Sequence, residues 1–315
     1  MKRQLAALLL ATLSAFWLDY PGTSMAADKI SFGVLPVMQA LPLFVAQEKG
    51  LFTEEGLTVE LVTFRSGLEK DAALAAGQTQ GYFGDMLTSI LVASNQMPVS
   101  MVATIFNTTG DQRMFAVLAA PGTGKPSLTE LAGKGIAGSS NTVIEYVTAR
   151  LLQRETPGAE LKMIETKNIL ARMPMLLQGQ VAGAVLPEPL VTLVQSKGAT
   201  VIADDRGLGI TSTILLFTHT FIKDHSEQVR AFLKAVSKAS ALINLDPEIA
   251  RPVMIKYARI PEPLQQSIAI PDFIPPEVPD KELVMDVYSW LKDKGILKKE
   301  LKYSEMVDGS MLPTN

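Results

Sequence analysis

One segment near the N-terminus, residues 30–67, limits the possible architecture more than any other part of the chain. Residues 30–34 alternate apolar and other side chains, as in a half-buried strand, and an apolar helix follows that stops at Gly50. A second β-rich run, 58–64, comes soon after this helix. A strand, a crossover helix and a next strand form a right-handed unit whose two strands are parallel. The segment therefore predicts an α/β fold built on a parallel sheet.

The loops that follow these two strands carry the first candidate site residues. Ligands of open parallel sheets bind in the crevice outside the carboxyl ends of the strands. Met38 and Gln39 lie in the first loop, and Arg65 and Ser66 lie in the second. Other readings stay open, because Met38 and Gln39 could be an ordinary lead-in to the helix and a lone arginine is often solvated. Ser66 also begins an S-x-x-E motif with Glu69, which predicts a helix cap.

The strand and helix pattern continues beyond this segment. A short strand is predicted at 81–84, and Asp85 follows it at the carboxyl end. Asp85 can cap the helix 86–94 and contact a ligand at the same time. Two more β-rich runs, 99–105 and 114–119, extend the first α/β series.

A glycine-rich turn separates this series from a second one that begins near residue 134. The turn resembles a phosphate-binding P-loop, but Ala119 stands where that motif needs glycine and Pro126 stands where it needs serine or threonine. We therefore exclude a nucleotide site of this kind. Strands and helices alternate again through Ala203, which predicts a second α/β lobe.

The strongest candidate site lies at the start of a helix in this second series. Ser139, Ser140, Asn141 and Thr142 place hydroxyl groups, an amide and free backbone N–H groups at a helix N-terminus. Such an arrangement favours an anion or another polar group. Thr142 and Glu145 also match a capping box, which explains part of the cluster structurally.

Glu188, which lies just past a predicted strand, has two possible roles. It can complement the dipole of the next helix, or it can accept hydrogen bonds from an amine or a pyrimidine-like solute while repelling sulfonate or nitrate. His219 and His225 are the only histidines and have no clustered partners, so we expect both at the surface and predict neither a metal site nor a catalytic triad. Three aromatic residues are predicted in the core rather than as stacking platforms: Phe44, Phe106 and Tyr146.

The first 26 residues have the layout of a secretory signal peptide, with a charged start, an apolar run at 5–18 and small residues before the cleavage position. The run is shorter than the ~20 residues that span a membrane. The chain has no cysteine, so it has neither a disulfide nor a cysteine to carry a lipid. We therefore expect a free periplasmic protein that is not lipid-anchored.

Removal of these residues takes the formal charge from −3 to −4, because two basic residues and one acidic residue are lost. A mildly acidic chain lacks the basic surface that binds nucleic acid or an anionic membrane. From Phe221 onward the chain is largely helical, and we expect these helices to return and cover the first lobe. Two connections, near 113–119 and 210–217, predict a hinge. The predicted organisation is lobe 1 at 27–115 and 216–315, and lobe 2 at 116–215.

Four segments resemble a known family, and they occur in the order found in that family. They are PLFVAQEKGLFTEEGLTVEL, GYFGDMLTSILVAS, GQVAGAVLPEP and FIKDHSEQVRAFLKAVSKASALINLDPE. The family is the periplasmic solute-binding proteins of ABC importers, in the nitrate, sulfonate and taurine group that also includes thiamine-pyrimidine binders. The resemblance implies a two-lobed periplasmic binding protein fold of type II, with a mainly parallel sheet flanked by helices in each lobe and a two-stranded hinge.

The resemblance also implies a function. We expect a monomer that captures a small polar solute between its lobes and delivers it to an ABC permease of the inner membrane, without catalysis and without a cofactor. An enzyme on the same fold, of the quinone or thiamine-pyrimidine biosynthesis type, is one alternative, since fold does not fix function. A solute-loaded sensor that signals to a membrane receptor is another, and the sequence does not separate it from a transport protein.

Overall fold

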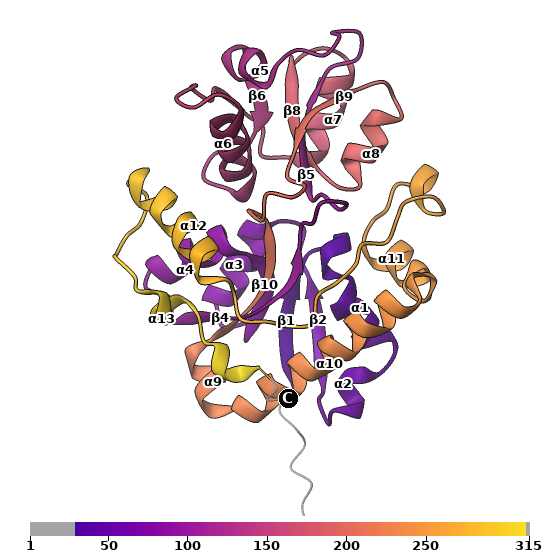
Figure 1. Ribbon diagram of the computed structural model, residues 1–315. Coiled ribbons are helices and arrows are strands. Elements are labelled where there is room, and N and C mark those ends of the chain that lie inside the picture. Colours follow the sequence, from indigo (N-terminus) through magenta and orange to yellow (C-terminus); the bar gives the residue numbers. More distant parts are fainter. Residues whose placement is uncertain (1–28, 313–315) are drawn as a thin grey trace, which may run out of the picture.

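Two five-stranded sheets, each flanked by helices, form the two lobes of the chain (Figure 1). The computed structural model describes residues 29–312, so the predicted signal peptide at 1–26 lies outside the described residues. Between residues 29 and 312, no helix is long and apolar enough to cross a membrane.

The first sheet has the strand order β2-β1-β3-β10-β4. Its strands are β1 (Ile30–Val34), β2 (Val59–Thr63), β3 (Gly81–Asp85), β4 (Val99–Asn107) and β10 (Ser212–Thr218). β1 is parallel to β2 and β3, as the sequence predicts. β10 is antiparallel to both of its neighbours, β3 and β4.

The second sheet repeats this plan, with the order β7-β6-β8-β5-β9. Its strands are β5 (Phe115–Ala119), β6 (Ile136–Gly138), β7 (Met163–Glu165), β8 (Gly183–Pro187) and β9 (Thr200–Asp204). β6 is parallel to β7 and β8, and β5 is antiparallel to β8 and β9. Each sheet has one reversed strand, and it is the first strand after a crossover. β5 follows the first crossover, and β10 follows the second.

Helices cover both sheets. In the first lobe they are α1 (Leu41–Glu48), α2 (Leu51–Glu54), α3 (Gly67–Ala75), α4 (Met86–Ser94), α9 (His219–Asp224), α10 (Ser226–Leu245), α11 (Arg251–Tyr257), α12 (Lys281–Asp293) and α13 (Tyr303–Met306), with the 3₁₀ helices η1 (Met38–Ala40), η2 (Pro247–Ile249), η3 (Glu262–Leu264) and η4 (Gly309–Met311). In the second lobe they are α5 (Leu128–Lys134), α6 (Val143–Glu155), α7 (Ile169–Leu177) and α8 (Leu190–Gln195).

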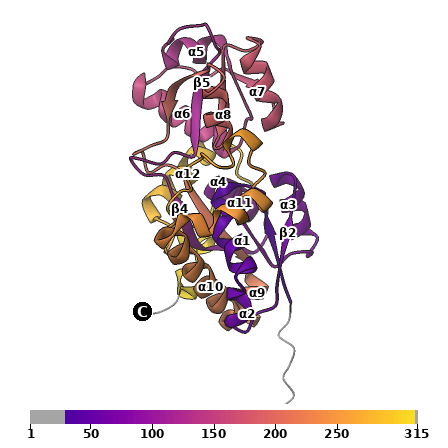
Figure 2. The ribbon, with the colours of Figure 1, turned by 90° about the vertical axis from the view of Figure 1, so that its right-hand side faces the viewer.

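The long helix α10 returns to the first lobe, as expected from the sequence, and lies beside α1 (Figure 2). Its buried Phe232 packs on Phe32 of β1 and Phe217 of β10, with ring centroids 4.7 and 5.4 Å away. Each fully buried aromatic side chain removes a large apolar area from water. This aromatic cluster joins α10, which follows the second crossover, to the first strand, so the core of the first lobe is complete only when α10 has folded onto it.

The crossovers between the lobes are residues 108–114 and 205–211, which differs from the sequence expectation. The predicted connections at 113–119 and 210–217 run into β5 and β10, whose residues are buried at inner positions of the sheets. The predicted lobe boundary between 215 and 216 falls within β10, all of which pairs in the first sheet. The two crossovers run side by side, since the Thr108 N–H donates to the Thr211 carbonyl at 3.3 Å and the Gly207 N–H donates to the Thr109 carbonyl at 2.9 Å.

One fully buried carboxylate, Asp205, ties the two crossovers together. Its Oδ1 accepts hydrogen bonds from the backbone N–H groups of Met114 and Phe115, at 2.9 and 3.1 Å. Its Oδ2 is buried and has no partner among the described residues. Burial disfavours the charged form and raises the pKa of Asp205 to about 6.

This raised pKa makes Asp205 a source of pH-dependent stability. The folded chain holds the Asp205 proton up to about pH 6, whereas an unfolded chain releases it near pH 4. Asp205 therefore lowers the free energy of unfolding as pH rises between these values, by up to about 3 kcal/mol. Asp205→Asn keeps an oxygen acceptor but does not titrate. In urea unfolding between pH 4 and 6.5, we expect the stability of the variant relative to wild type to increase as pH rises.

The matched control is Asp205→Leu, which removes the acceptor and should be less stable than Asp205→Asn at every pH, because two buried N–H groups lose their partner. If the free energy of unfolding changed equally with pH in wild type and Asp205→Asn, the raised pKa of Asp205 would be contradicted.

Candidate functional site

The carboxyl ends of the parallel strands lie at the crossover end of both sheets. In the first sheet Asn107, where β4 leaves for the second lobe, pairs with Ser212, and Asp85 at the end of β3 pairs with Thr213. In the second sheet Pro187 at the end of β8 pairs with Phe115, the first residue of β5. Because the crossovers leave and enter at these residues, the strand ends of each lobe are turned toward the other lobe. Nine of the ten predicted site residues follow such strand ends, and the tenth, Asp85, is the last residue of β3.

In the first lobe, the two predicted site residues after β1 are almost completely buried. Met38 and Gln39 lie in the helix η1 and are 3% and 6% exposed. After β2, Ser66 caps α3 by accepting a hydrogen bond from the Glu69 N–H at 3.2 Å, which confirms the predicted cap but not the full capping box. The Glu69 carboxylate accepts from the backbone N–H of Arg65 at 3.0 Å, and the Arg65 side chain is exposed.

Asp85 caps α4, as the sequence predicts. Its Oδ1 accepts from the Thr88 N–H at 2.8 Å and its Oδ2 accepts from the Thr88 hydroxyl at 3.0 Å. Burial raises the pKa of Asp85, and the two hydrogen bonds oppose this rise. Each oxygen keeps a lone pair, so the capping role leaves room for a ligand contact.

A buried lysine behind these strand ends is a feature that the sequence interpretation missed. Lys70 of α3 is 2% exposed, and its Nζ lies 2.9 Å from Asp71 Oδ1 and over the ring of Tyr82. Gly33 makes room for it, because a Cβ at Gly33 would lie 3.3 Å from the Lys70 stem and 3.2 Å from Tyr82. Burial lowers the pKa of Lys70, and Asp71 opposes this. The sequence does contain a signal for this burial: Lys70 stands one turn before Ala73 and Leu74, on the apolar side of α3.

In the second lobe, the loop Ser139–Thr142 follows β6 and leads into α6. The expectation of free backbone N–H groups is wrong for two of its residues. The Ser140 N–H donates to Glu165 Oε2 at 3.0 Å, and the Asn141 N–H donates to Glu145 Oε2 at 2.6 Å. Glu165 belongs to β7 and reaches the loop only through the fold.

The predicted capping box of α6 does not form either. The Thr142 hydroxyl donates to the Ser139 carbonyl at 2.7 Å and makes no cap hydrogen bond to the helix. Among residues 29–312, no acceptor is found for the N–H groups of Val143 and Ile144 at the start of α6. These N–H groups are therefore available to an acceptor from outside the chain.

A fully buried arginine lies behind this loop, and the sequence analysis did not predict it. Arg172 of α7 donates to the Thr166 carbonyl at 2.8 Å, the Val185 carbonyl at 3.2 Å and the Ser139 hydroxyl at 2.9 Å. All three acceptors are neutral. The nearby Glu165 carboxylate favours the charged form of Arg172, although no described residue forms an ion pair with this arginine. Burial lowers the pKa of Arg172 to about 10, so the side chain still carries its charge at neutral pH.

Glu188 serves as a helix-start carboxylate, which is one of its two expected roles. Its Oε2 accepts from the N–H and the hydroxyl of Thr192 at 3.1 and 2.9 Å. Its Oε1 lies 2.7 Å from Arg113 Nε, and that arginine also donates to Gln195 at 2.6 Å. The Glu188 charge is therefore balanced by Arg113, which lies in the first crossover.

The remaining expectations concern aromatic, histidine and metal chemistry. Phe44, Phe106 and Tyr146 are each 1% exposed, which confirms their place in the core. His219 is exposed, and His225, which stacks on Phe221, is half-buried. Within residues 29–312 no group of His, Asp and Glu could hold a metal ion.

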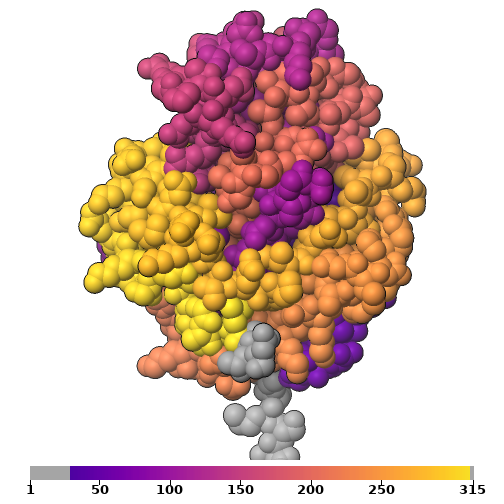
Figure 3. Space-filling view, in the orientation of Figure 1, coloured from indigo at the N-terminus to yellow at the C-terminus, as the bar shows by residue number. Residues whose placement is uncertain are grey.

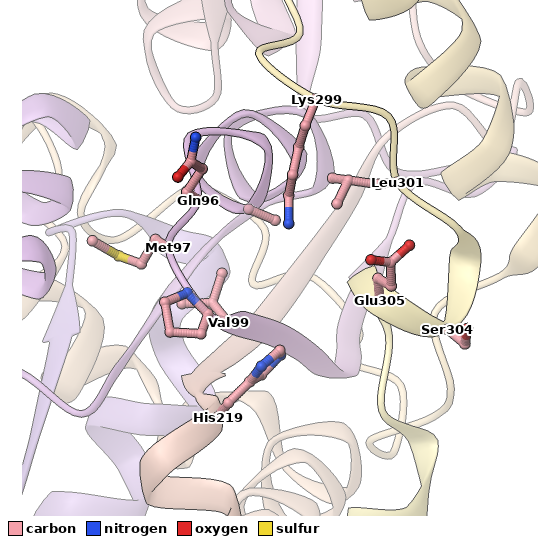
Figure 4. Close-up of a pocket in the computed structure, with 10 residues that line it drawn as sticks. Gln96, Met97, Val99, His219, Lys299, Leu301, Ser304 and Glu305 are labelled. Atoms are coloured by element: carbon pink, nitrogen blue, oxygen red, sulfur yellow. The ribbon is translucent and has the colours of Figure 1, made fainter.

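A pocket of about 460 Å³ lies at the other end of the first sheet, away from the crossovers (Figure 4). It is lined by Val99 at the start of β4 and by His219 just after β10, and the Lys299 amine points into it. This position separates it from the strand ends that carry the predicted site, so we assign it no part in that site.

Solved structures of other proteins share this fold, and three of them serve as examples. The aliphatic sulphonate binding protein SsuA from Escherichia coli has a TM-score of 0.75 and 15% identity, over 89% of this chain and 92% of that one. SsuA from Xanthomonas axonopodis pv. citri, bound to MOPS, has a TM-score of 0.73 and 14% identity, over 90% and 97%. The nitrate-binding protein NrtA from Synechocystis PCC 6803 has a TM-score of 0.67 and 12% identity, over 90% and 87%.

These likenesses establish a periplasmic binding protein fold, with the two lobes and mainly parallel sheets that the sequence predicts. No protein with a curated function matches the sequence significantly. The family model described as NMT1/THI5 like matches residues 38–250, which is more than half of the chain. The chain belongs to the NMT1/THI5-like family.

Proposed function

We propose that this protein is the periplasmic solute-binding component of an ABC importer. It captures a small polar solute between the strand ends of its two lobes and delivers it to a permease. The fold and the family support a binding protein, since the similar structures include sulfonate-binding and nitrate-binding proteins of importers. The predicted signal peptide and the absence of cysteine support a free protein in the periplasm.

The observation that carries the choice of solute is the fully buried Arg172 behind the loop Ser139–Thr142. A buried charge whose hydrogen-bond acceptors are all neutral is costly. The nearby Glu165 carboxylate offsets part of this cost, and a bound anion would offset more of it. The N–H groups at the start of α6 lie beside the same loop and add positive potential. Lys70 is a second buried cation, behind the facing strand ends of the first lobe, but Asp71 already pairs with it, so Arg172 carries the argument. We therefore infer a solute that carries an anionic group.

Glu188 does not oppose this choice. As a free carboxylate it would repel sulfonate or nitrate, but it is paired with Arg113 and hydrogen-bonded to Thr192. Its remaining capacity to accept hydrogen bonds suits an amine on the same solute, as in an aminosulfonate.

Thermal unfolding of the purified mature protein tests this function. The panel comprises taurine, an alkanesulfonate, nitrate and a thiamine-type pyrimidine. An anionic member at 100 times its dissociation constant should add about 2.7 kcal/mol to the free energy of unfolding, because it binds only the folded state. The expected result is a rise in the melting temperature of several degrees. Stabilisation by the pyrimidine alone, or by no member of the panel, would contradict the proposal.

Cell fractionation with N-terminal sequencing separates the binding protein from an enzyme on the same fold. We expect a periplasmic protein that has lost its first 26 residues. An uncleaved cytoplasmic protein would favour the enzyme. Mass spectrometry of the compound released from the purified protein would identify the solute directly.

Arg172→Met tests the role of the buried charge. The substitution keeps an apolar stem of similar length and removes the guanidinium, so we expect affinity for the anionic member of the panel to fall about 10-fold to 100-fold. Calorimetric titration measures this loss. Arg172→Lys keeps the charge but not the fork of donors, and should retain more affinity than Arg172→Met.

The matched control is Arg154→Met, an exposed arginine of α6 in the same lobe. Its substitution should leave affinity unchanged, since solvent screens its charge. If Arg172→Met folds, as judged by circular dichroism, and binds as wild type does, the buried charge has no role in anion binding.

A further inference from the structure

The two lobes are held together outside the crossovers by contacts between α6 and α12. In Figure 1, α12 lies below α6, and in Figure 3 the gold C-terminal surface meets the magenta surface of the second lobe. α12 packs on α4 of the first lobe through a buried face that includes Val284 and Leu291. Asp286, Trp290 and Lys294 reach the second lobe. Their spacing of four residues places them along one side of the helix.

Asp286 is the centre of the first part of this interface. Its Oδ2 accepts a hydrogen bond from the Tyr146 hydroxyl at 2.6 Å, and its two oxygens accept from Arg150 Nε and Nη2 at 3.1 and 2.7 Å. The Tyr146 ring meets Trp290 edge to face, with centroids 5.6 Å apart. A forked arginine–carboxylate pair beside a buried aromatic contact is a specific and well-oriented interaction.

Glu145 forms the second part, one residue before Tyr146. Its Oε1 lies 2.5 Å from Lys294 Nζ of the first lobe, and both side chains are largely buried, at 15% and 28% exposure. Its Oε2 accepts the hydrogen bond from the Asn141 N–H. Asn141 has a φ of +59°, a left-handed backbone conformation that asparagine adopts more readily than most residues.

We propose that Glu145 is a positioning residue that couples the approach of the two lobes to the shape of the loop Ser139–Thr142. One oxygen of Glu145 holds the loop and the other meets Lys294 of the first lobe. The cluster of Asp286, Tyr146 and Arg150 latches the lobes in the arrangement that allows this contact. The latch itself stands independently of the proposed function, whereas its effect on solute binding rests on that function.

The first experiment measures the distance between the lobes. The chain has no cysteine, so Lys49→Cys and Lys197→Cys, at exposed positions in the first and second lobe, provide the only two spin-label sites. Electron–electron distance measurement between these two spin labels compares the chain with the unaltered latch and the chain that also carries Asp286→Ala and Lys294→Met. We expect a narrow distance distribution for the intact latch and a distribution shifted or broadened by several ångströms for the double substitution. No ligand is needed, so a failure of the latch is distinguishable from a failure of the proposed function.

The matched control is Lys292→Met on the same helix. Lys292 pairs with Glu300 at 2.7 Å within the first lobe, and among residues 29–312 no hydrogen bond or ion pair joins its side chain to the second lobe. Its substitution removes one positive charge from α12, as Lys294→Met does, but leaves the latch intact. A change of lobe distance in Lys292→Met, or no change in the double substitution, would overturn the latch.

The second experiment tests the coupling through hydrogen exchange of the peptide that covers residues 139–145. Lys294→Met alone should raise the exchange rate at the loop about 5-fold to 10-fold, because Glu145 loses the partner that holds it toward Asn141, while Lys292→Met should not. Glu145→Asp, which keeps the charge on a shorter stem, should raise it less than Glu145→Ala. Lobe separation without faster loop exchange would show that Glu145 does not couple the two.

Discussion

Two passages of the chain between lobes determine the architecture on which everything else depends. A strand that enters a lobe from the crossover must run away from it, and β5 and β10 are accordingly the reversed strands of their sheets. All other strands then point their carboxyl ends back toward the crossovers. Right-handed parallel units place their loops and helix N-termini at those ends. The loops of both lobes therefore face each other, and the polar loop residues of one lobe are brought to those of the other without any long connection.

Buried charges distinguish these facing ends from the rest of the core. Lys70 and Arg172 lie behind the strand ends of the first and second lobes, and each is enclosed by close neighbours rather than by water. Removing a charge from water costs several kcal/mol unless partners offset it, and Arg172 has only neutral acceptors. An apolar residue would fill the same space at lower cost. Retaining a charge there is consistent with a site whose occupant completes the electrostatic balance, and the latch between α6 and α12 adds a means of bringing the two charged walls together.

The sequence predicted the positions of the candidate site residues on helices and loops better than it predicted their hydrogen-bond partners. The sequence predicted Ser66 and Asp85 as helix caps, and both form. A cap joins residues three apart, so its pattern is visible in the sequence. The loop Ser139–Thr142 was located correctly, but its open N–H groups were not at Ser140 and Asn141, because Glu165 and Glu145 occupy them. Glu188 was placed at a helix start, but its partner Arg113 is 75 residues away in the chain. Partners of this kind depend on sheet order, which local patterns do not contain.

The sequence by itself determined the α/β alternation, most strand and helix positions, the return of the C-terminal helices and the membership of a broad class of two-lobed proteins. These properties follow from periodicity, capping and turn residues, each of which acts over a few positions. Only the tertiary structure decided where the lobes divide within 205–211, which charges are buried and which helices hold the lobes together. Asp205, Arg172 and Asp286 acquire their roles from residues that lie far away in the chain, and the energy of a buried charge depends on the whole surrounding fold rather than on its neighbours in sequence.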